Sequence, residues 1–518
     1  MTDATASLTP ELAKALRSDL GGYTISAVEG MLGEAAMSAL RREQRVPALY
    51  RARAASASRS ARLAIHVRLF LLGDTVEDRE IELALPRVCA SEGLRAALLD
   101  GGRARFQVVP TAIPTHLPIP ALVGTEAGRQ DVLIASDWGE LVGVVPRPDH
   151  VMPVGGATRT LAALANYSPG ARVLDVGTGC GIHAILAALS GAKVTATDVS
   201  ARALAYAAFN AALAGVDVAL RRGNLFEPVE GRYDVVVSNP PFVITPDSVR
   251  SKVSHRYRDS GREGDRLLAE MVASLGSVLA PGGRAWMLGN WEIRGEWSDG
   301  PASWLETGRF DAWVIQRERL EPARYVEMWL RDGGLTPRDE GYEQAYEAWI
   351  RDFEKRGVTG VGMGYISVGF DDDGLPRGPW RRFEELYGPA PANLHEFAEV
   401  VWSNRGLMMC SDAELERKRL VAHGIEHRLY APGQKEPFML KIAQSEGFAA
   451  EVEVTSAVAA VVGACDGELS VGILMESAAK LLDTDVAEVR KEVMPALREL
   501  IGLGVLRRSH STIAARRI

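Results

Sequence analysis

The residues of this chain that are best suited to chemistry lie in one stretch, 173–242. An apolar run there ends in Asp175, and glycines follow it at alternate positions within residues 177–181. Because glycine carries no side chain, a ligand can approach the backbone of such a turn, and the N–H groups of the following helix can bind its polar atoms. A second apolar run ends in Asp198, whose carboxylate can accept hydrogen bonds from ribose hydroxyls. The stretch therefore predicts a nucleoside-containing cofactor.

The segment Asn239–Phe242 distinguishes between two such cofactors. The spacing Gly-x-Gly-x-Gly differs from the dinucleotide fingerprint, in which the third glycine comes one residue later. Alone, this turn fits either a nicotinamide cofactor or S-adenosylmethionine. The sequence Asn-Pro-Pro-Phe follows a further apolar run, Tyr233–Val237. Hydride transfer has no use for this tetrad, whereas methyl transfer to a planar nitrogen does.

The tetrad carries groups that suit such a transfer. In an amide or an exocyclic amine the nitrogen lone pair is conjugated, and two acceptors placed on the N–H hydrogens favour its rotation toward the methyl group. The side-chain oxygen of Asn239 and the backbone carbonyl of Pro240 are predicted to be these acceptors. The fixed φ of Pro240 and Pro241 stiffens the loop. Phe242 is predicted to offer a face to the planar acceptor, the alternative being a core aromatic.

These motifs, in this order, give residues 173 to about 370 a resemblance to the class I S-adenosylmethionine-dependent methyltransferases. The tetrad narrows the resemblance to the amino-methylating branch, which includes N6-adenine, ribosomal RNA guanine-N2 and release-factor glutamine-N5 methyltransferases. The resemblance implies S-adenosylmethionine as cofactor, with S-adenosylhomocysteine as its product, and implies that Asp175 orders the glycine turn. The residues expected to contact the cofactor are Asp175, Gly177, Thr178, Gly179, Asp198, Val199, Asn224, Leu225 and Asn239.

The chain departs from the family pattern after the third strand. The family commonly has an aspartate there that accepts a hydrogen bond from adenine N6, whereas this chain has Asn224 followed by Leu225. The amide oxygen of Asn224 can still accept a hydrogen bond, but without a charge. Leu225 is expected to supply a backbone N–H and an apolar contact.

The predicted fold class is α/β, with a Rossmann-like seven-stranded methyltransferase core, an N-terminal α/β domain and a C-terminal winged-helix-like α+β module. Strands and helices alternate in the core, residues 146–372, which indicates a mainly parallel sheet. The resemblance implies that the last strand is antiparallel. The seven strands are expected at residues 173–176, 194–197, 218–221, 234–238, 284–288, 312–316 and 364–370, and the helices at 182–189, 201–214 and 265–279.

The two flanking regions carry different patterns. Residues 1–145 are expected to form a recognition or capping domain, with apolar residues at helical spacing over 25–40. In residues 373–518 a hairpin around Pro432 and two helices, 471–482 and 486–503, resemble a winged-helix module.

Composition narrows the classes of function. The chain has 518 residues, a formal net charge of −8 and 47% hydrophobic residues, which is typical of an ordinary globular protein without an overall preference for nucleic acid. None of the four cysteines lies in a Cys-x-x-Cys pair, so neither a zinc site nor a disulfide framework is indicated. The start of the chain lacks a signal-peptide pattern, and its apolar windows are too short to span a bilayer. We expect a cytoplasmic protein without a metal or a membrane partner.

Two basic segments are candidates for binding a substrate. Residues 41–68 contain eight arginines and one acid, Glu43. They predict either a phosphate-facing surface or a solvated face bonded to acids of a neighbouring domain. The loop 243–265 is basic in its middle and is predicted either to hold substrate or to be a solvated lid. The residues expected to contact the substrate are Pro241, Arg256 and Tyr257.

The sequence leaves three hypotheses for the substrate. An exocyclic base amine in ribosomal or transfer RNA is favoured, because of the basic segments and because Phe242 suits stacking under a splayed base. The alternative is the glutamine amide of a translation-related protein, but the release-factor enzymes have a small helical bundle in place of this longer N-terminal region. In the third hypothesis the fold is a scaffold that binds a partner, against which the intact motifs argue.

Overall fold

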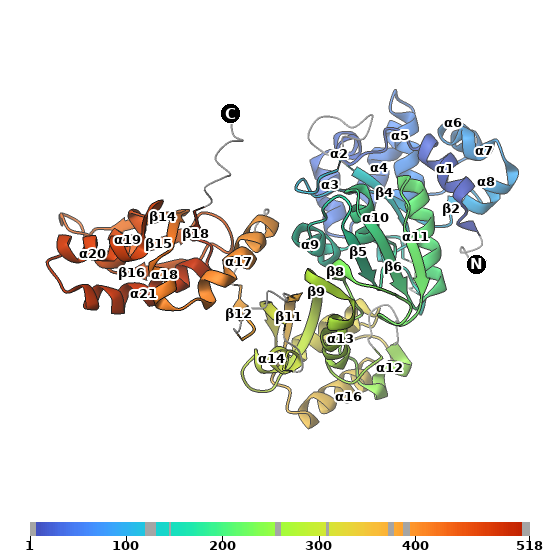
Figure 1. Cartoon of the computed structure of the whole chain (residues 1–518). Coiled ribbons are helices and arrows are strands. Elements are labelled where there is room, and N and C mark those ends of the chain that lie inside the picture. Colours follow the sequence, from blue (N-terminus) through green and yellow to red (C-terminus); the bar gives the residue numbers. More distant parts are fainter. Residues whose placement is uncertain are drawn as a thin grey trace. The chain divides into compact units, whose positions relative to one another are not determined.

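The computed structural model describes residues 7–119, 131–143, 147–253, 261–306, 310–370, 378–386 and 394–509. Contacts divide the chain into two compact units, Met1–Gly374 with Arg381–Glu384, and Leu375–Trp380 with Glu385–Ile518 (Figure 1). The two predicted domain borders, 145–146 and 372–373, lie outside the described residues, and the three-domain division stays a prediction.

The first unit is built on an eight-stranded sheet with the order β12-β10-β11-β9-β8-β5-β6-β7. The strands from β7 to β9 run parallel, and β11 is antiparallel to both of its neighbours, β9 and β10. All seven predicted strands are present, and the antiparallel last strand is confirmed; β12 at the edge was not predicted. The strands are β5 (Arg172–Val176), β6 (Lys193–Asp198), β7 (Ala219–Arg222), β8 (Tyr233–Ser238), β9 (Leu279–Ile293), β10 (Asp311–Leu320), β11 (Gly360–Phe370) and β12 (Arg381–Glu385).

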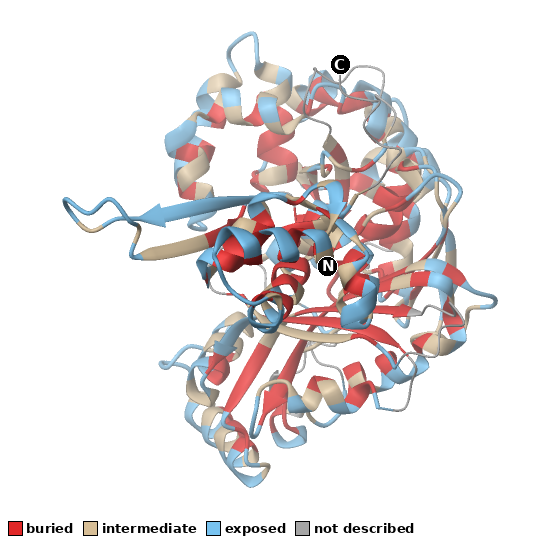
Figure 2. Cartoon of the chain, turned by 60° about the vertical axis from the view of Figure 1, so that its left-hand side comes forward, coloured by how far each residue is buried: buried red, intermediate tan, exposed pale blue. Residues whose placement is uncertain are grey.

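Helices cover this sheet, and most of its strand residues are buried (Figure 2). The bounds of α10 and α11 are those that the sequence predicted. A core cluster that includes Leu174, Leu275 and Ile366 joins the sheet to α13, and a second cluster around Tyr325 and Trp349 joins α15 to α16. The helices are α9 (Gly156–Leu164), α10 (Ile182–Leu189), α11 (Ala201–Ala214), α12 (Asp247–Val253), α13 (Arg266–Val278), α14 (Asp299–Trp304), α15 (Pro322–Asp332) and α16 (Tyr342–Lys355).

The N-terminal region is mainly helical and carries two small antiparallel strand pairs, β1 with β2 and β3 with β4. The single helix expected over residues 25–40 is broken at Gly33, whose φ of 77° ends α2 before α3 begins. The elements are α1 (Pro10–Asp19), α2 (Ile25–Leu32), α3 (Glu34–Arg41), α4 (Val46–Ala55), α5 (Ala61–His66), the π-helix η2 (Val67–Leu71), α6 (Asp78–Ala84), α7 (Pro86–Cys89), α8 (Glu92–Leu98), β1 (Leu99–Asp100), β2 (Arg103–Ala104), β3 (Gln107–Ala112), β4 (Asp131–Ser136) and the 3-10 helix η3 (Glu140–Val142).

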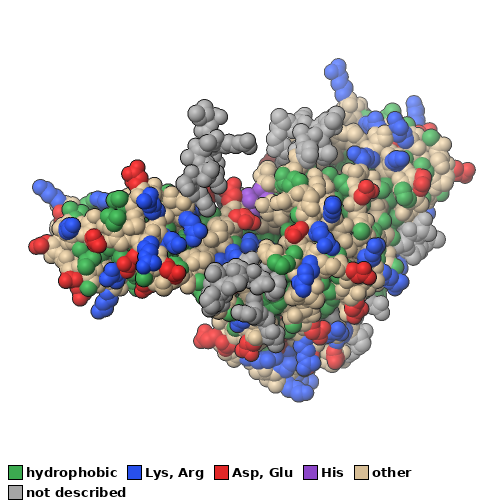
Figure 3. Space-filling model, viewed as in Figure 1, with side chains coloured by type: hydrophobic (Ala, Val, Ile, Leu, Met, Phe, Trp, Pro, Cys, Tyr) green, Lys and Arg blue, Asp and Glu red, His purple; other side chains and the backbone are tan. Residues whose placement is uncertain are grey.

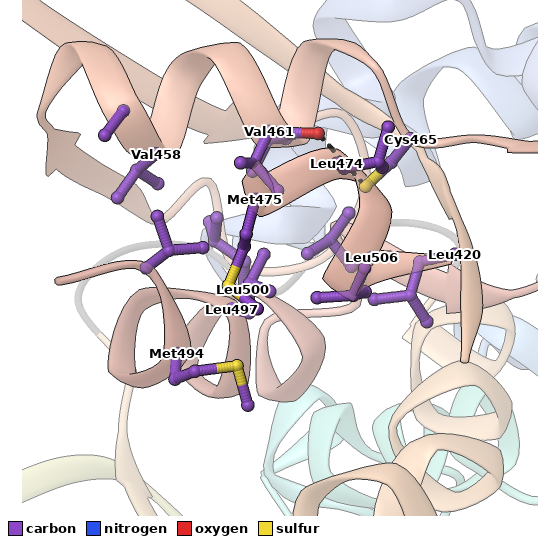
Figure 4. Packing of buried hydrophobic residues seen from close by; sticks show 14 of the residues in the cluster. Leu420, Val458, Val461, Cys465, Leu474, Met475, Met494, Leu497, Leu500 and Leu506 are labelled. Carbon is purple, nitrogen blue, oxygen red and sulfur yellow. Dashed lines mark hydrogen bonds between the residues drawn. The ribbon is translucent and has the colours of Figure 1, made fainter. Parts of the chain in front are cut away.

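The second unit has the order of a winged helix, in which α19, β17, α20, α21 and β18 follow one another and β13 is the middle strand. Side chains of Val461, Met475 and Leu497 meet in its core, where the Cys465 thiol donates to the Val461 carbonyl at 3.3 Å (Figure 4). The elements are α17 (Leu394–Met409), α18 (Asp412–Glu416), β13 (Arg419–Ala422), β14 (Gly424–Leu429), β15 (Met439–Gln444), β16 (Glu451–Val454), α19 (Ser456–Gly463), β17 (Asp466–Ser470), α20 (Val471–Leu481), α21 (Val486–Gly502) and β18 (Leu506–Arg508).

A buried asparagine of α11 joins the N-terminal region to the core of the first unit. The Asn210 amide oxygen accepts from the Ala135 N–H at 2.7 Å. Its amide nitrogen donates to the carbonyls of Ala135 and Cys180, both at 2.8 Å. Because Ala135 belongs to β4 and Cys180 lies in the glycine turn, one side chain holds both segments.

We expect Asn210→Leu to destabilise the first unit by about 2–5 kcal/mol, because a side chain of similar volume leaves buried backbone groups unpaired. Urea unfolding of the full chain measures the change. The control Gln44→Leu alters an exposed amide and should leave the unfolding free energy within about 0.5 kcal/mol of the parent. Equal stability of the Asn210 variant and the parent would contradict the expectation.

Candidate functional site

The glycine turn follows β5 and is open on one side. The N–H groups of Gly177 and Thr178 both donate to the Thr197 carbonyl at 2.9 Å, which fixes the turn against the end of β6. A Cβ atom added at Gly177 or at Gly179 would meet no atom within 4 Å. At Gly181 it would lie 3.0 Å from the Cα and Cβ of Ala207 in α11. The first two glycines therefore leave room for a ligand, and the third lets α11 pack closely.

The buried carboxylate of Asp175 organises this turn. It accepts from the Thr178 hydroxyl at 2.6 Å and from the Ala184 N–H of α10 at 3.1 Å. Burial raises the pKa of Asp175 to about 7, although these two hydrogen bonds act to lower it. The role of ordering the turn, which the resemblance implied, agrees with this geometry.

Asp198 lies at the end of β6, beside the turn. One carboxylate oxygen accepts from the Gly179 N–H at 3.0 Å, and the other accepts from the Ser200 N–H at 2.8 Å. Burial raises the pKa of Asp198, against the lowering effect of these backbone N–H groups. Val199, the next residue, is 61% exposed. Since each carboxylate oxygen has a second lone pair, Asp198 can also accept from a ribose hydroxyl.

The segment after β7 contributes a strained residue. Leu225 has a φ of 47°, a left-handed conformation that is rare for a bulky side chain and concentrates at ligand sites. Its carbonyl accepts from the Thr197 hydroxyl at 3.2 Å. The amide nitrogen of Asn224 donates to Glu227 at 3.3 Å. This contact uses the NH₂ group of Asn224, so its amide oxygen can still accept a hydrogen bond.

The Asn-Pro-Pro-Phe tetrad follows β8, which pairs with β5. Ser238 pairs with Val176 and donates to its carbonyl at 2.8 Å, so the tetrad begins beside the glycine turn. The Asn239 amide nitrogen donates to the Thr158 hydroxyl of α9 at 3.3 Å. The amide oxygen of Asn239 is buried and has no hydrogen-bond partner. Because buried polar atoms are almost always bonded, this acceptor suits an N–H group brought by a ligand.

Phe242, the last residue of the tetrad, packs against the protein. Its ring meets Trp329 of α15 edge to face, with the ring centroids 6.5 Å apart. The Ile244 N–H donates to the Tyr325 hydroxyl at 3.0 Å, which holds the chain after the tetrad on the same helix. Pro240 is buried, whereas Pro241 and Phe242 are half-buried. Phe242 thus fulfils part of the alternative, packing role.

The structure brings one group of the predicted residues together, and a second group lies outside its described part. The ends of β5, β6 and β8 bring Asp175, Asp198 and Asn239 to the carboxyl edge of the sheet, where α/β proteins bind ligands. Arg256 and Tyr257 lie outside the described residues. Thr158 was missed, because a threonine at the start of a helix carries no sequence signal for a partner 81 positions away. In the described part of the chain no group of three or more His, Cys, Asp or Glu is arranged to hold a metal ion.

The site fits S-adenosylmethionine on three observations of its own structure. The turn has free space over Gly177 and Gly179, a carboxylate lies at the neighbouring strand end, and an unpartnered acceptor follows the end of β8 at the same edge of the sheet. None of the described helices is both long enough and apolar enough to cross a membrane.

Comparisons with known proteins agree with this site. Residues 154–296 match the methyltransferase small domain, and residues 21–109 match a domain of unknown function, DUF7059. The release factor glutamine methyltransferase of Bordetella pertussis is 38% identical over 158 residues, 29% of this chain and 57% of that protein. The enzyme of the same name from Cereibacter sphaeroides is 32% identical over 236 residues, 39% of this chain and 82% of that protein.

Two further similarities are more limited. The ribosomal RNA small subunit methyltransferase C of Alcanivorax borkumensis is 30% identical over 140 residues, 27% of this chain and 38% of that protein. A solved S-adenosylmethionine-dependent methyltransferase from Thiobacillus denitrificans, in complex with S-adenosylhomocysteine, is 20% identical with a TM-score of 0.25, covering 44% of this chain and 95% of that one. The chain spans 57% of the length of the Bordetella protein, 82% of the Cereibacter protein and 38% of the Alcanivorax protein.

The sheet order, the glycine turn and the tetrad define a class I methyltransferase with a Rossmann-like fold. The chain belongs to the S-adenosylmethionine-dependent N-methyltransferase family that includes the release factor glutamine methyltransferases. The family resemblance, the fold class and the cofactor expected from the sequence are thereby confirmed.

We expect the buried Asp175 to make stability depend on pH. Its folded-state pKa, about 7, lies above the ordinary value of 3.8, so the folded chain holds a proton that the unfolded chain has released. The protonated side chain therefore adds to the free energy of unfolding below the unfolded pKa, and this stabilisation, on the order of a few kcal/mol, is lost as pH rises through the folded pKa. Urea unfolding between pH 4 and pH 7.5 should show a decline that Asp175→Asn reduces.

Asp217→Asn, which changes an exposed aspartate, is the matched control and should keep the parent's pH dependence. If the Asp175 variant kept it as well, the buried carboxylate would not be its source.

Proposed function

We propose that this protein transfers a methyl group from S-adenosylmethionine to a planar amino nitrogen, with the glutamine amide of a translation-related protein as the first candidate acceptor. The observation that carries the reaction type is the buried, unpartnered amide oxygen of Asn239. The relatives named release factor glutamine methyltransferase support the choice of acceptor. The sequence alone favoured a base amine in RNA over this acceptor. Such a substrate would place the reaction in the cytoplasm.

An exocyclic base amine in RNA is the second candidate acceptor. A relative named ribosomal RNA small subunit methyltransferase C supports it. Arginines of the N-terminal region, such as Arg45 and Arg103, support it as well, because they bond no acid among the described residues. Both acceptors are planar, conjugated nitrogens with two hydrogens, so the same tetrad chemistry applies to each.

The cofactor supplies an activated methyl group, and the protein supplies its orientation. Gly177 and Gly179 provide the open backbone, and Asp198 provides an acceptor for the ribose. At the other side of the site, the Asn239 oxygen and the Pro240 carbonyl accept from the two N–H groups of the substrate nitrogen. Since both acceptors are fixed before the substrate arrives, they favour the lone-pair orientation that the transfer needs. The residues that complete the proposed cofactor contacts are Asp175, Thr178, Val199, Asn224 and Leu225.

Thr158 acts in this scheme as a positioning residue. Its hydroxyl oxygen accepts from the Asn239 amide nitrogen at 3.3 Å. An asparagine amide presents an acceptor at one end and a donor at the other. In the structure the contact to Thr158 engages the NH₂ group and leaves the oxygen for the substrate.

We expect Asn239→Ala to lower kcat by about 100-fold or more, because an acceptor used in the transition state is removed. Thr158→Val should lower kcat by about 10-fold with little change in cofactor affinity, and Thr158→Ser should restore activity because the hydroxyl returns. Single-turnover methylation and calorimetric titration with S-adenosylmethionine measure the two quantities.

Asp198→Ala is the contrasting control, because it should weaken cofactor binding by about 10-fold or more. A Thr158→Val variant with the parent's kcat would remove the positioning role. An Asn239→Ala variant with unchanged kcat and cofactor affinity would refute the proposed reaction type.

The acceptor itself is tested with radiolabelled S-adenosylmethionine in a lysate of cells that lack this protein. Loss of the label on protease digestion is the expected result and supports the glutamine amide, which amino acid analysis of the digest identifies. Label that ribonuclease removes would transfer the proposal to a base amine. Bound cofactor without any labelled macromolecule would contradict both acceptors.

A further inference from the structure

The structure divides the arginines of residues 41–68 into two sets. Four of the eight bond acids, as the alternative predicted, but these acids belong to the N-terminal region itself and not to a neighbouring domain. The ion pairs are Arg41 with Glu34, Arg53 with Asp74, Arg62 with Asp19, and Arg68 with Asp74 and Glu80. The other four, Arg42, Arg45, Arg51 and Arg59, bond no acid among the described residues, and the same holds for Arg103 of β2.

Two of these guanidinium groups, those of Arg45 and Arg103, lie near a carboxylate, Asp74, that already bonds two other arginines. Asp74 accepts from Arg53 at 3.0 and 2.6 Å and from Arg68 at 2.9 Å. Arg103 reaches over the adjacent Gly73, with its Nη2 3.4 Å from the position of an added Cβ there. Arg45 is half-buried beside them. Arg45, Arg53 and Arg103 therefore form a cluster with more positive charge than Asp74 neutralises.

The charges in this cluster act against one another. Burial lowers the pKa of the Arg45 guanidinium, and the nearby Arg103 and Arg53 lower it further, against the opposing effect of Asp74. Like charges that lie close together and outnumber the nearby acids are stabilised by an anion from outside. Arginine suits phosphate because its planar guanidinium donates two parallel hydrogen bonds.

An exposed aromatic residue lies on the same helix as part of this cluster. Tyr50 of α4 is 76% exposed, and Val46, one turn earlier, is 74% exposed. Arg53 follows Tyr50 by three positions and therefore shares its face of the helix. Figure 3 shows basic side chains on the N-terminal helices, at the upper right of that view. Phosphate-binding cations beside an exposed ring form the combination that binds single-stranded RNA, since bases stack on aromatic rings.

We propose that the region of residues 21–109, which matches a domain of unknown function, binds single-stranded RNA. Arg45 and Arg103 contact its phosphates, and Tyr50 stacks on a base. This binding surface is separate from the methyl-transfer site and requires neither cofactor nor acceptor. A chain with a net charge of −8 does not attract RNA as a whole, so the attraction is local.

The test is fluorescence anisotropy of a short labelled oligouridylate with the full chain, without S-adenosylmethionine, at several salt concentrations. We expect the affinity to fall as salt rises. Arg45→Gln/Arg103→Gln should weaken binding at least about 10-fold and reduce the slope of log affinity against log salt by about 1.4, since each phosphate contact on a single strand contributes about 0.7. Tyr50→Ala should weaken binding several-fold with the slope unchanged.

The matched control is Arg324→Gln/Arg338→Gln, which removes the same charge from two exposed positions in the methyltransferase region, residues 146–372. A loss equal to that of Arg45→Gln/Arg103→Gln would show a general charge effect and overturn the proposal. Polyglutamate that competes as well as RNA would indicate an acidic protein as the partner instead. Absence of binding by the parent chain would also overturn it. Thermal unfolding confirms that each variant is folded. Methyl transfer is measured in a separate assay, so a failure of RNA binding is distinguished from a failure of the proposed function.

Discussion

The structure of the site depends on a carboxylate that is buried where its charge is costly. Asp175 joins the end of β5 to the glycine turn through Thr178, and to the first turn of α10 through the Ala184 N–H. Burial raises the pKa of this side chain to about 7. Its bonds to Thr178 and Ala184 nevertheless hold the turn in an open shape. The exposed backbone at Gly177 and the bond from Gly179 to Asp198 both require that shape.

Helix α11 extends this order into the N-terminal region. Ala207 contacts the turn at Gly181, and Asn210 holds both Cys180 and Ala135. Near the start of the helix, Arg202 and Tyr206 bond Asp137, which follows β4. Burial acts to raise the pKa of Asp137, but Arg202 and the Val151 N–H hold it below its usual value. The pair of strands β3 and β4 is therefore fixed to the element that shapes the cofactor turn.

Sequence reasoning succeeded where the signal was local. The ends of β5, β6 and β8 were predictable, because each apolar run stops at or beside a polar residue, Asp175, Asp198 or Ser238, and the bounds of α10 and α11 followed from helical spacing. It failed where the cause was distant. The sequence of β12, Arg-Arg-Phe-Glu-Glu, lacks the alternation of a strand and is a strand only because an edge of the sheet is available. One glycine, Gly33, broke a helix that the apolar pattern continued.

The same division holds for the site and the basic segment. The glycine turn and the tetrad were readable from residue type, whereas the bond from Thr158 to Asn239 and the pairing of Arg53 with Asp74 depend on the fold. A count of arginines thus gives the charge of a segment but not the number of guanidinium groups that remain for a ligand. The roles expected for Arg256 and Tyr257 stay predictions, since both residues lie outside the described part of the chain.

The unpartnered amide oxygen of Asn239 also limits how many methyl groups one nitrogen receives. Under the proposed chemistry, the unmodified nitrogen brings two hydrogens, one for the Asn239 oxygen and one for the Pro240 carbonyl. After one transfer only a single hydrogen remains, so one of the two oxygens is left without a partner, and a buried group without a partner is costly. The product therefore binds less well in the reactive orientation than the substrate. The geometry that promotes the first methylation opposes a second, and the enzyme would release a monomethylated nitrogen.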